Sequence, residues 1–159
     1  MKNIIIFDLD ETCINSEHRT PNNPDGTLNL PAYIELHSAD NVAKDTLLPI
    51  SRIMRDRYNM GDYIIILTAR DMAEWDYKYL DIHDLPYNKI MSRDKCKTKK
   101  HYNMKDGEYK RKWIKSFLNL KQFVNKPIIM FDDSKPVKSI LRSLFPVLCA
   151  HKINRKFSA

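Results

Sequence analysis

Two aspartates stand two residues apart, directly behind a short apolar run near the start of the chain. Asp8 and Asp10 follow residues 3–7, whose continuous apolar character is typical of a strand buried on both faces. A buried, unpaired carboxylate costs on the order of several kcal/mol, and a hard divalent cation bound by its oxygens offsets that cost most simply. The alternative is a solvated strand end with turn-forming aspartates.

A second acidic pair follows another apolar run near the other end of the chain. Asp132 and Asp133 come directly after residues 127–131. In open parallel sheets the functional site lies beyond the carboxyl ends of the strands, so both acidic pairs are expected there. The sequence therefore predicts an oxygen-only Mg²⁺ site formed by Asp8, Asp10, Asp132 and Asp133.

Such a site suits the hydrolysis of a phosphate monoester, which needs a nucleophile, a proton donor and neutralising charge. Asp8 is the predicted nucleophile and would form an aspartyl-phosphate, while Asp10 would protonate the leaving group. Thr68, at the end of the apolar run 64–67, would donate its hydroxyl to a phosphoryl oxygen. Lys110 would hold the phosphoryl group, and three neighbours remain alternatives for this cation: Lys105, Arg111 and Lys112.

The elements that must position these side chains alternate between strands and helices. The sequence predicts strands at 3–7, 64–67, 89–91, 127–131 and 146–150, and helices at 49–60, 71–83, 108–118 and 134–144. This alternation indicates an α/β fold, a Rossmann-like three-layer α/β/α sandwich around a mostly parallel sheet. Residues 1–159 are expected to form one domain. Residues 13–41 are polar and rich in proline, and are expected to be an irregular excursion or, at most, a rudimentary cap.

Composition excludes several classes of protein. With 43% hydrophobic and 30% charged residues, and without a long apolar stretch or a signal-peptide pattern, the chain is expected in the cytoplasm and away from membranes. Three separated cysteines and five scattered histidines indicate neither disulfides nor a zinc site. The net charge of +7, with lysine and arginine concentrated between 93 and 121, favours polyanions, although a merely soluble surface is the alternative.

The chain resembles the phosphatases of the haloacid dehalogenase superfamily. The family's four short motifs occur here in order, as Asp8-Leu9-Asp10-Glu11-Thr12, Thr68, Lys110 and Asp132-Asp133. The resemblance implies Mg²⁺ as cofactor and the roles given above. Glu11 departs from the pattern because many relatives have glycine there, so the turn after Asp8 is expected to differ.

A closer resemblance is to the 3′-phosphatase domain of the polynucleotide kinase–phosphatases. There too a strand closes with Ser/Thr-x-Arg, here Thr68-Ala69-Arg70, and a later strand ends in arginine, here Arg93. The resemblance implies that Arg70 and Arg93 contact the substrate, together with Thr12. The alternative for Arg70 is a surface ion pair with Asp71 or Glu74. A kinase half is not expected, because no phosphate-binding glycine loop can be written in this sequence.

The spacing between motifs leaves little room for a cap, and an open site suits a large substrate. The first expectation is therefore removal of phosphate from nucleic-acid ends, with a preference for 3′-phosphates. The alternative is a nucleotidase or small-molecule phosphatase, with residues 13–41 or a second subunit as lid. A non-catalytic module that binds phosphate ends is a third reading, and the sequence does not determine the oligomeric state.

Overall fold

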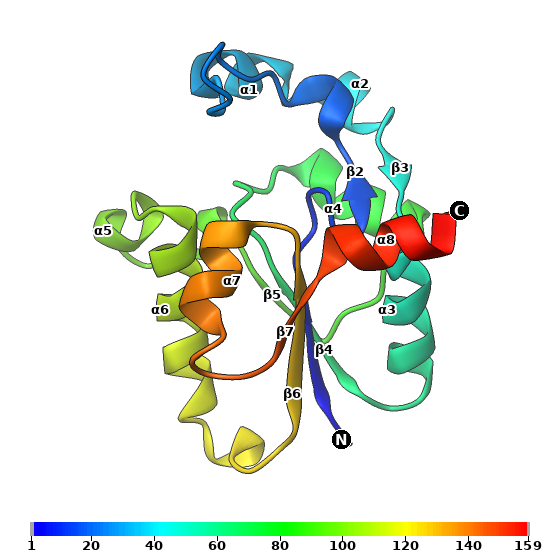
Figure 1. Ribbon diagram of the computed structural model, residues 1–159, viewed down its shortest axis with the longest axis vertical. Helices are drawn as coiled ribbons and strands as arrows, with labels where there is room; N and C mark the ends of the chain where they lie inside the picture. The colour runs from blue at the N-terminus through cyan, green and yellow to red at the C-terminus, as the bar shows by residue number, and fades with distance from the viewer. Residues whose placement is uncertain (1, 159) are drawn as a thin grey trace.

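The computed structural model describes residues 2–158 and is built on a central sheet of five parallel strands (Figure 1). The strand order is β5-β4-β1-β6-β7, so the first strand of the chain lies in the middle of the sheet. The five strands are β1 (Ile4–Phe7), β4 (Tyr63–Leu67), β5 (Lys89–Met91), β6 (Ile128–Asp132) and β7 (Val147–Cys149). In the register of the three central strands, Phe7 pairs with Ile66 on one side and with Phe131 on the other.

Helices cover both faces of this sheet, which confirms the predicted three-layer sandwich. Side chains of β1 alternate between two cores: Ile5 and Phe7 face one, and Ile4 and Ile6 face the other. The first core is closed by α3 (Ile50–Asn59), α4 (Glu74–Ile82) and α8 (Ala150–Ser158), and the second by α6 (Asp106–Leu118) and α7 (Lys135–Leu141). Among residues 2–158, no helix combines the length and apolar character that crossing a bilayer requires.

Two features of the helical layers were not predicted. The segment 92–105, to which the sequence analysis assigned no helix or strand, contains a short helix, α5 (Lys99–Tyr102). The helix α8 follows β7 directly, where the sequence analysis assigned no element. The apolar pattern that would predict α8 is weak, because Ile153 packs against the core while Phe157 remains 66% exposed.

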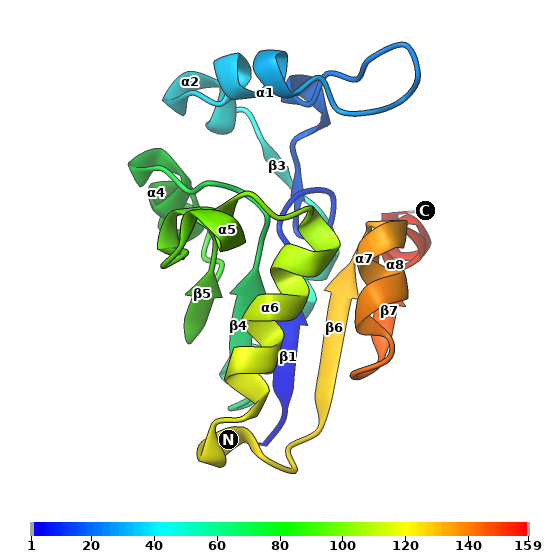
Figure 2. The same ribbon diagram turned by 90° about the vertical axis from the view of Figure 1, so that its left-hand side faces the viewer.

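The excursion, defined here as residues 13–48, is more regular than expected. It leaves and rejoins the sheet through an antiparallel pair, β2 (Ile14–Asn15) and β3 (Thr46–Leu47), and contains α1 (Leu30–Leu36) and α2 (Ala39–Val42). Both helices begin at a side-chain cap, because Asn29 accepts from the amide of Ala32 and Ser38 from that of Asn41. Figures 1 and 2 show α1 and α2 beyond the carboxyl edge of the sheet.

Asn154 of α8 ties three distant parts of the chain together behind this edge. Its side-chain oxygen accepts from the amide of Ile50, at the first turn of α3, at 3.0 Å. Its amide nitrogen donates to the carbonyl of Thr12, four residues after Asp8, also at 3.0 Å. The last helix therefore supports the loop that carries the first acidic pair.

Replacing Asn154 by alanine is expected to lower the free energy of unfolding by about 2–4 kcal/mol, because two buried backbone groups lose their partners. Urea unfolding measures this loss. Arg155→Ala, on the exposed side of the same helix, is the matched control and is expected to change stability by less than about 0.5 kcal/mol. Equal effects of the two substitutions would show that the Asn154 contacts do not hold the loop.

Candidate active site

Three carboxylates converge at the carboxyl edge of the sheet. Asp8, Asp132 and Asp133 each place one oxygen within 4.8 Å of the oxygens of the other two. The reason is topological: β1 and β6 are neighbours in parallel register, so both strands deliver their following residues to the same place. The structure thus brings together three of the four predicted metal ligands, from opposite ends of the chain. We call these three residues the acidic cluster.

A single buried ammonium bridges two members of the acidic cluster. Lys110, on α6, donates to Asp8 Oδ1 at 2.9 Å and to Asp132 Oδ2 at 2.7 Å. Burial alone would lower the pKa of Lys110, but the two carboxylates outweigh it and raise the pKa, so the group stays charged. Of the alternatives, Lys105 and Lys112 are exposed, and Arg111 is half-buried and lies 3.9 Å from Glu108. Lys110 is the one of these four cations that contacts Asp8, and its role as the motif lysine stays a prediction.

One ammonium does not balance three carboxylates. Burial and the charge of Asp132 raise the pKa of Asp8 well above its usual value, although Lys110 opposes them. Burial and Asp132 also raise the pKa of Asp133. Three converging oxygen donors with surplus negative charge fit a hard divalent cation, so Asp8, Asp132 and Asp133 are the residues that would hold Mg²⁺.

Asp10, the fourth predicted ligand, stands outside the acidic cluster. Arg70 donates to its Oδ1 at 2.5 Å and to its Oδ2 at 3.2 Å, and the Ser16 hydroxyl donates to Oδ1 at 2.8 Å. Both carboxylate oxygens are therefore engaged away from the predicted metal position. Burial raises the pKa of Asp10, but the charge and hydrogen bonds of Arg70 outweigh burial and lower the pKa well below its ordinary value.

Arg70 is buried, and the alternative surface pair with Asp71 or Glu74 is wrong. Its Nη1 donates to Asp76 Oδ1 at 2.8 Å, at the start of α4. Asp76 is fixed in turn by His37 of the excursion, whose Nε2 lies 2.8 Å from its Oδ2. The excursion and α4 therefore meet around the arginine that holds Asp10.

Both predicted threonines lie at the same edge, in different roles. The Thr12 hydroxyl donates to Asp8 Oδ2 at 3.1 Å, so it orients Asp8. Thr68 directly follows β4, and its Oγ1 accepts from the amide of Arg70 at 3.1 Å, which leaves its hydroxyl proton available for a further acceptor. The Tyr109 hydroxyl donates to the Thr68 carbonyl at 2.8 Å and fixes this strand end against α6.

Arg93 is occupied by the protein itself. Its Nε donates to the Ala69 carbonyl at 2.8 Å, its Nη1 to the Tyr102 carbonyl at 2.5 Å and its Nη2 to Asp106 at 2.7 Å. The guanidinium carbon also lies 4.3 Å from the centroid of the Tyr109 ring. In this arrangement Arg93 braces α5 and α6 against the loop after β4, and its predicted contact with substrate stays a prediction.

The turn after Asp8 explains the unusual Glu11. This residue has φ = +58°, the left-handed region that glycine adopts at little cost. Glu11 compensates locally, because its Oε1 accepts from the Ser16 amide at 2.9 Å and lies 3.3 Å from the Ser16 hydroxyl oxygen. The turn therefore keeps the conformation that the more common glycine would favour.

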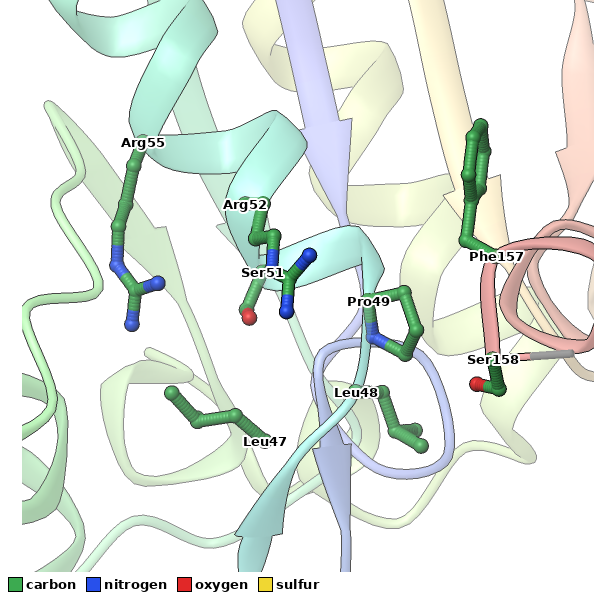
Figure 3. A pocket seen from close by; sticks show the side chains of 8 residues that line it. All are labelled: Leu47, Leu48, Pro49, Ser51, Arg52, Arg55, Phe157 and Ser158. Carbon is green, nitrogen blue, oxygen red and sulfur yellow. The ribbon is translucent and has the colours of Figure 1, made fainter.

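A separate hollow of about 490 Å³ lies between the start of α3 and the end of α8 (Figure 3). It is lined by Leu47, Leu48, Pro49, Ser51, Arg52, Arg55, Phe157 and Ser158. None of these is a predicted site residue. This hollow is therefore separate from the predicted site.

Four residues at this edge were missed by the sequence analysis: Ser16, Arg19, Asp45 and Asp76. Arg19 binds Asp45 through two nitrogens, and both side chains are buried. In the sequence these are isolated polar residues, three of them in a segment that reads as solvent-exposed. The folded path of the excursion brings Ser16, Arg19 and Asp45 close to Asp10 or to its partner Arg70, whereas Asp76 meets Arg70 from α4.

A family model described as bacteriophage T5 5′-deoxynucleotidase matches residues 1–159. The chain belongs to this family. The 5′-deoxynucleotidase of Escherichia phage T5 is 34% identical over 168 residues, which cover 95% of this chain and 68% of that protein.

Solved structures confirm the predicted fold. A chain of the Pnkp1/Rnl/Hen1 RNA repair complex superposes with a TM-score of 0.67 at 22% identity, over 94% of this chain and 42% of that one. The haloacid dehalogenase-like protein SP0104 from Streptococcus pneumoniae superposes with a TM-score of 0.64 at 16% identity, over 93% of this chain and 84% of that one. The chain thus spans less than half of the RNA repair protein. The likeness shows a haloacid dehalogenase-like fold, and the family match indicates a hydrolase of the phosphatase or nucleotidase type.

Replacing Asp133 by asparagine is expected to raise the free energy of unfolding of the metal-free protein near pH 7. Its pKa is higher in the folded than in the unfolded protein, so its charged form opposes folding above the folded pKa. This penalty disappears as the pH falls through the folded pKa toward the unfolded value of about 4. Urea unfolding in a chelator, at neutral pH and near pH 4, measures the difference.

Added Mg²⁺ is expected to make the parent protein more stable than Asp133→Asn near pH 7, because the variant lacks one of the three oxygens that would bind the cation. Asp40→Asn, an exposed position on α2, is the matched control and is expected to show neither effect. A variant no more stable than the parent in chelator would contradict the surplus of negative charge.

Proposed function

We propose that this protein is a Mg²⁺-dependent phosphomonoesterase that removes phosphate from deoxynucleoside 5′-monophosphates. The observation that carries the proposal is the acidic cluster, bridged by Lys110 and lying at the same edge as Asp10. This arrangement supplies a nucleophile, a cation binding site and a candidate proton donor together. The proposal unites this geometry with the family to which the chain belongs.

Asp8 is the proposed nucleophile. Its two oxygens are oriented by Lys110 and by the Thr12 hydroxyl, so the carboxylate is held before the substrate arrives. In the first step a bond forms between an Asp8 oxygen and phosphorus while the bond from phosphorus to the nucleoside oxygen breaks. Water then hydrolyses the aspartyl-phosphate and frees Asp8.

Lys110 balances negative charge on the transferred group, and the Thr68 hydroxyl donates a hydrogen bond to one of its oxygens. Both side chains are buried. A bound Mg²⁺ would supply Lewis-acid stabilisation of the phosphoryl oxygens. Asp8, Asp132 and Asp133 are proposed to hold it. Because the three carboxylates carry surplus charge, their mutual repulsion would fall when the cation is bound.

Asp10 is the proposed general acid, and Arg70 controls it. While Arg70 binds both of its oxygens, Asp10 remains ionised. The phosphate of an arriving substrate competes for the same guanidinium, which weakens the ion pair and lets Asp10 carry a proton. Asp10 then gives that proton to the departing nucleoside oxygen.

The substrate class is proposed from the family and from the path of the excursion. The sequence analysis preferred nucleic-acid 3′-ends because it expected an open, capless edge. The excursion instead forms α1 and α2 beyond that edge, and its residues reach Asp10 and Asp76. A small substrate beneath such a segment fits the alternative reading, a nucleotidase whose excursion serves as lid.

Removal of 3′-phosphates from nucleic-acid ends is a second candidate, favoured by one observation. Four exposed lysines follow Arg93, two before α5 and two in its first turn: Lys95, Lys97, Lys99 and Lys100. A polynucleotide lying on them would bind less tightly as salt increases, whereas a mononucleotide would respond weakly. Salt dependence therefore separates the two candidates.

A panel of phosphate esters at equal concentration tests the proposal. Deoxynucleoside 5′-monophosphates are expected to react at least about tenfold faster than a 3′-phosphorylated oligonucleotide and its 5′-phosphorylated counterpart. Phosphate release is measured with Mg²⁺, after chelation, and after Mg²⁺ is restored. Asp8→Asn, purified in parallel, is the control for contaminating phosphatases and is expected to be inactive. Faster reaction of the 3′-phosphorylated oligonucleotide, with strong salt dependence, would favour the second candidate.

A further inference from the structure

Four charged side chains form a closed ring of alternating sign beside the acidic cluster. Arg70 Nη2 lies 2.5 Å from Asp10 Oδ1 and 3.8 Å from Asp45 Oδ2. Arg19 Nη2 lies 2.8 Å from the same oxygen of Asp45 and 3.9 Å from the same oxygen of Asp10. Each carboxylate oxygen therefore faces two guanidinium nitrogens. We call these four residues the charge ring.

The excursion supplies half of the charge ring. Asp10 and Arg70 belong to the loops that follow β1 and β4, whereas Arg19 and Asp45 belong to its outgoing and returning limbs. Three of the four side chains are at most 1% exposed, and Asp10 alone is open, at 30%. The one accessible member of the ring is thus the proposed proton donor.

Asp45 is itself fixed from several sides. Its Oδ1 lies 2.8 Å from His18 Nε2 and accepts from Arg19 Nε at 2.9 Å. Its backbone carbonyl accepts from the Tyr79 hydroxyl of α4 at 2.8 Å. A residue held by both the excursion and the helical layer can keep Arg70 in place when Arg70 loosens its hold on Asp10.

Stability alone is a weak explanation for this arrangement. A buried ion pair rarely stabilises a fold more than apolar residues of the same volume would, because both charges lose their hydration. Arg19 and Asp45 are buried in a segment that could pack with apolar side chains instead. The benefit of Arg19 and Asp45 is then geometric, since they fix the orientations of Asp10 and Arg70.

We infer that Arg19 and Asp45 are positioning residues, which hold the Asp10 carboxylate toward the leaving group through the charge ring. The inference rests on the proposed role of Asp10. It makes the excursion part of the catalytic machinery as well as a cover. A small misplacement of a catalytic group can cost on the order of a hundredfold in rate, so residues that touch no substrate can still control turnover.

The test is the dependence of Asp45→Asn on the leaving group. This variant keeps the side-chain shape but removes one negative charge, so both arginines turn toward Asp10 and displace it. We expect kcat to fall by about tenfold to a hundredfold for a deoxynucleoside 5′-monophosphate and for ethyl phosphate, which both need a proton donor. For p-nitrophenyl phosphate, whose leaving group needs none, we expect a change of less than about threefold.

Asp62→Asn is the matched control. Asp62 is also buried and paired with an arginine, Arg57, but at the amino end of β4, on the opposite edge of the sheet. This substitution is expected to lower stability without changing the ratio of the three rates. If Asp45→Asn does not fold, Arg19→Lys serves instead, because it keeps the charge near Asp45 but loses the fork that faces Asp10.

The possible outcomes are distinct. Equal loss on all three substrates would show a merely structural role, and loss on the nucleotide alone would show a contact with the nucleoside; either result overturns the inference. Asp10→Asn in the same assay distinguishes a failure of the proposed acid role from a failure of the inference about Arg19 and Asp45. If it slows all three substrates equally, the acid role itself fails and the inference falls with it. If it shows the leaving-group pattern and Asp45→Asn does not, only the inference fails.

Discussion

Repulsion among three carboxylates around one ammonium is the interaction on which the rest of the site depends. Asp8, Asp132 and Asp133 face one another at close range, and Lys110 can neutralise only part of their charge. A fold tolerates such a group only where strong packing holds it, and the central strands provide that packing through two apolar cores. The same surplus of charge that opposes folding creates affinity for a divalent cation.

Charge is also the means by which the excursion is joined to the core. Asp8 of the acidic cluster and Asp10 of the charge ring follow β1 and stand only two residues apart. Their environments differ sharply: burial and like charges raise the pKa of Asp8, while Arg70 lowers that of Asp10. Neighbouring carboxylates whose pKa values are shifted in opposite directions are suited to different roles in one reaction.

The sequence predicted the parts of this arrangement that depend on strand periodicity. Buried parallel strands appear in the sequence as apolar runs, which predict the sheet. Acidic residues directly follow two of these runs, and they meet in space because the two strands are neighbours. Lys110 was identified by resemblance and could not be separated from nearby lysines by pattern alone. The structure of the excursion could not be predicted, because Arg19 and Asp45 look like solvated polar residues until the fold buries them together. The helix α8 could not be predicted because only one of its faces is partly apolar.

The central claim is that residues from the two ends of the chain bind one divalent cation at the carboxyl edge of the sheet. A crystal soaked in Mn²⁺, with data collected near the manganese absorption edge, tests it most directly. The account predicts an anomalous peak within about 2.5 Å of a carboxylate oxygen of Asp8 and of an oxygen of Asp132 or Asp133. A peak elsewhere, with the acidic cluster unchanged and bridged by Lys110 alone, would contradict it.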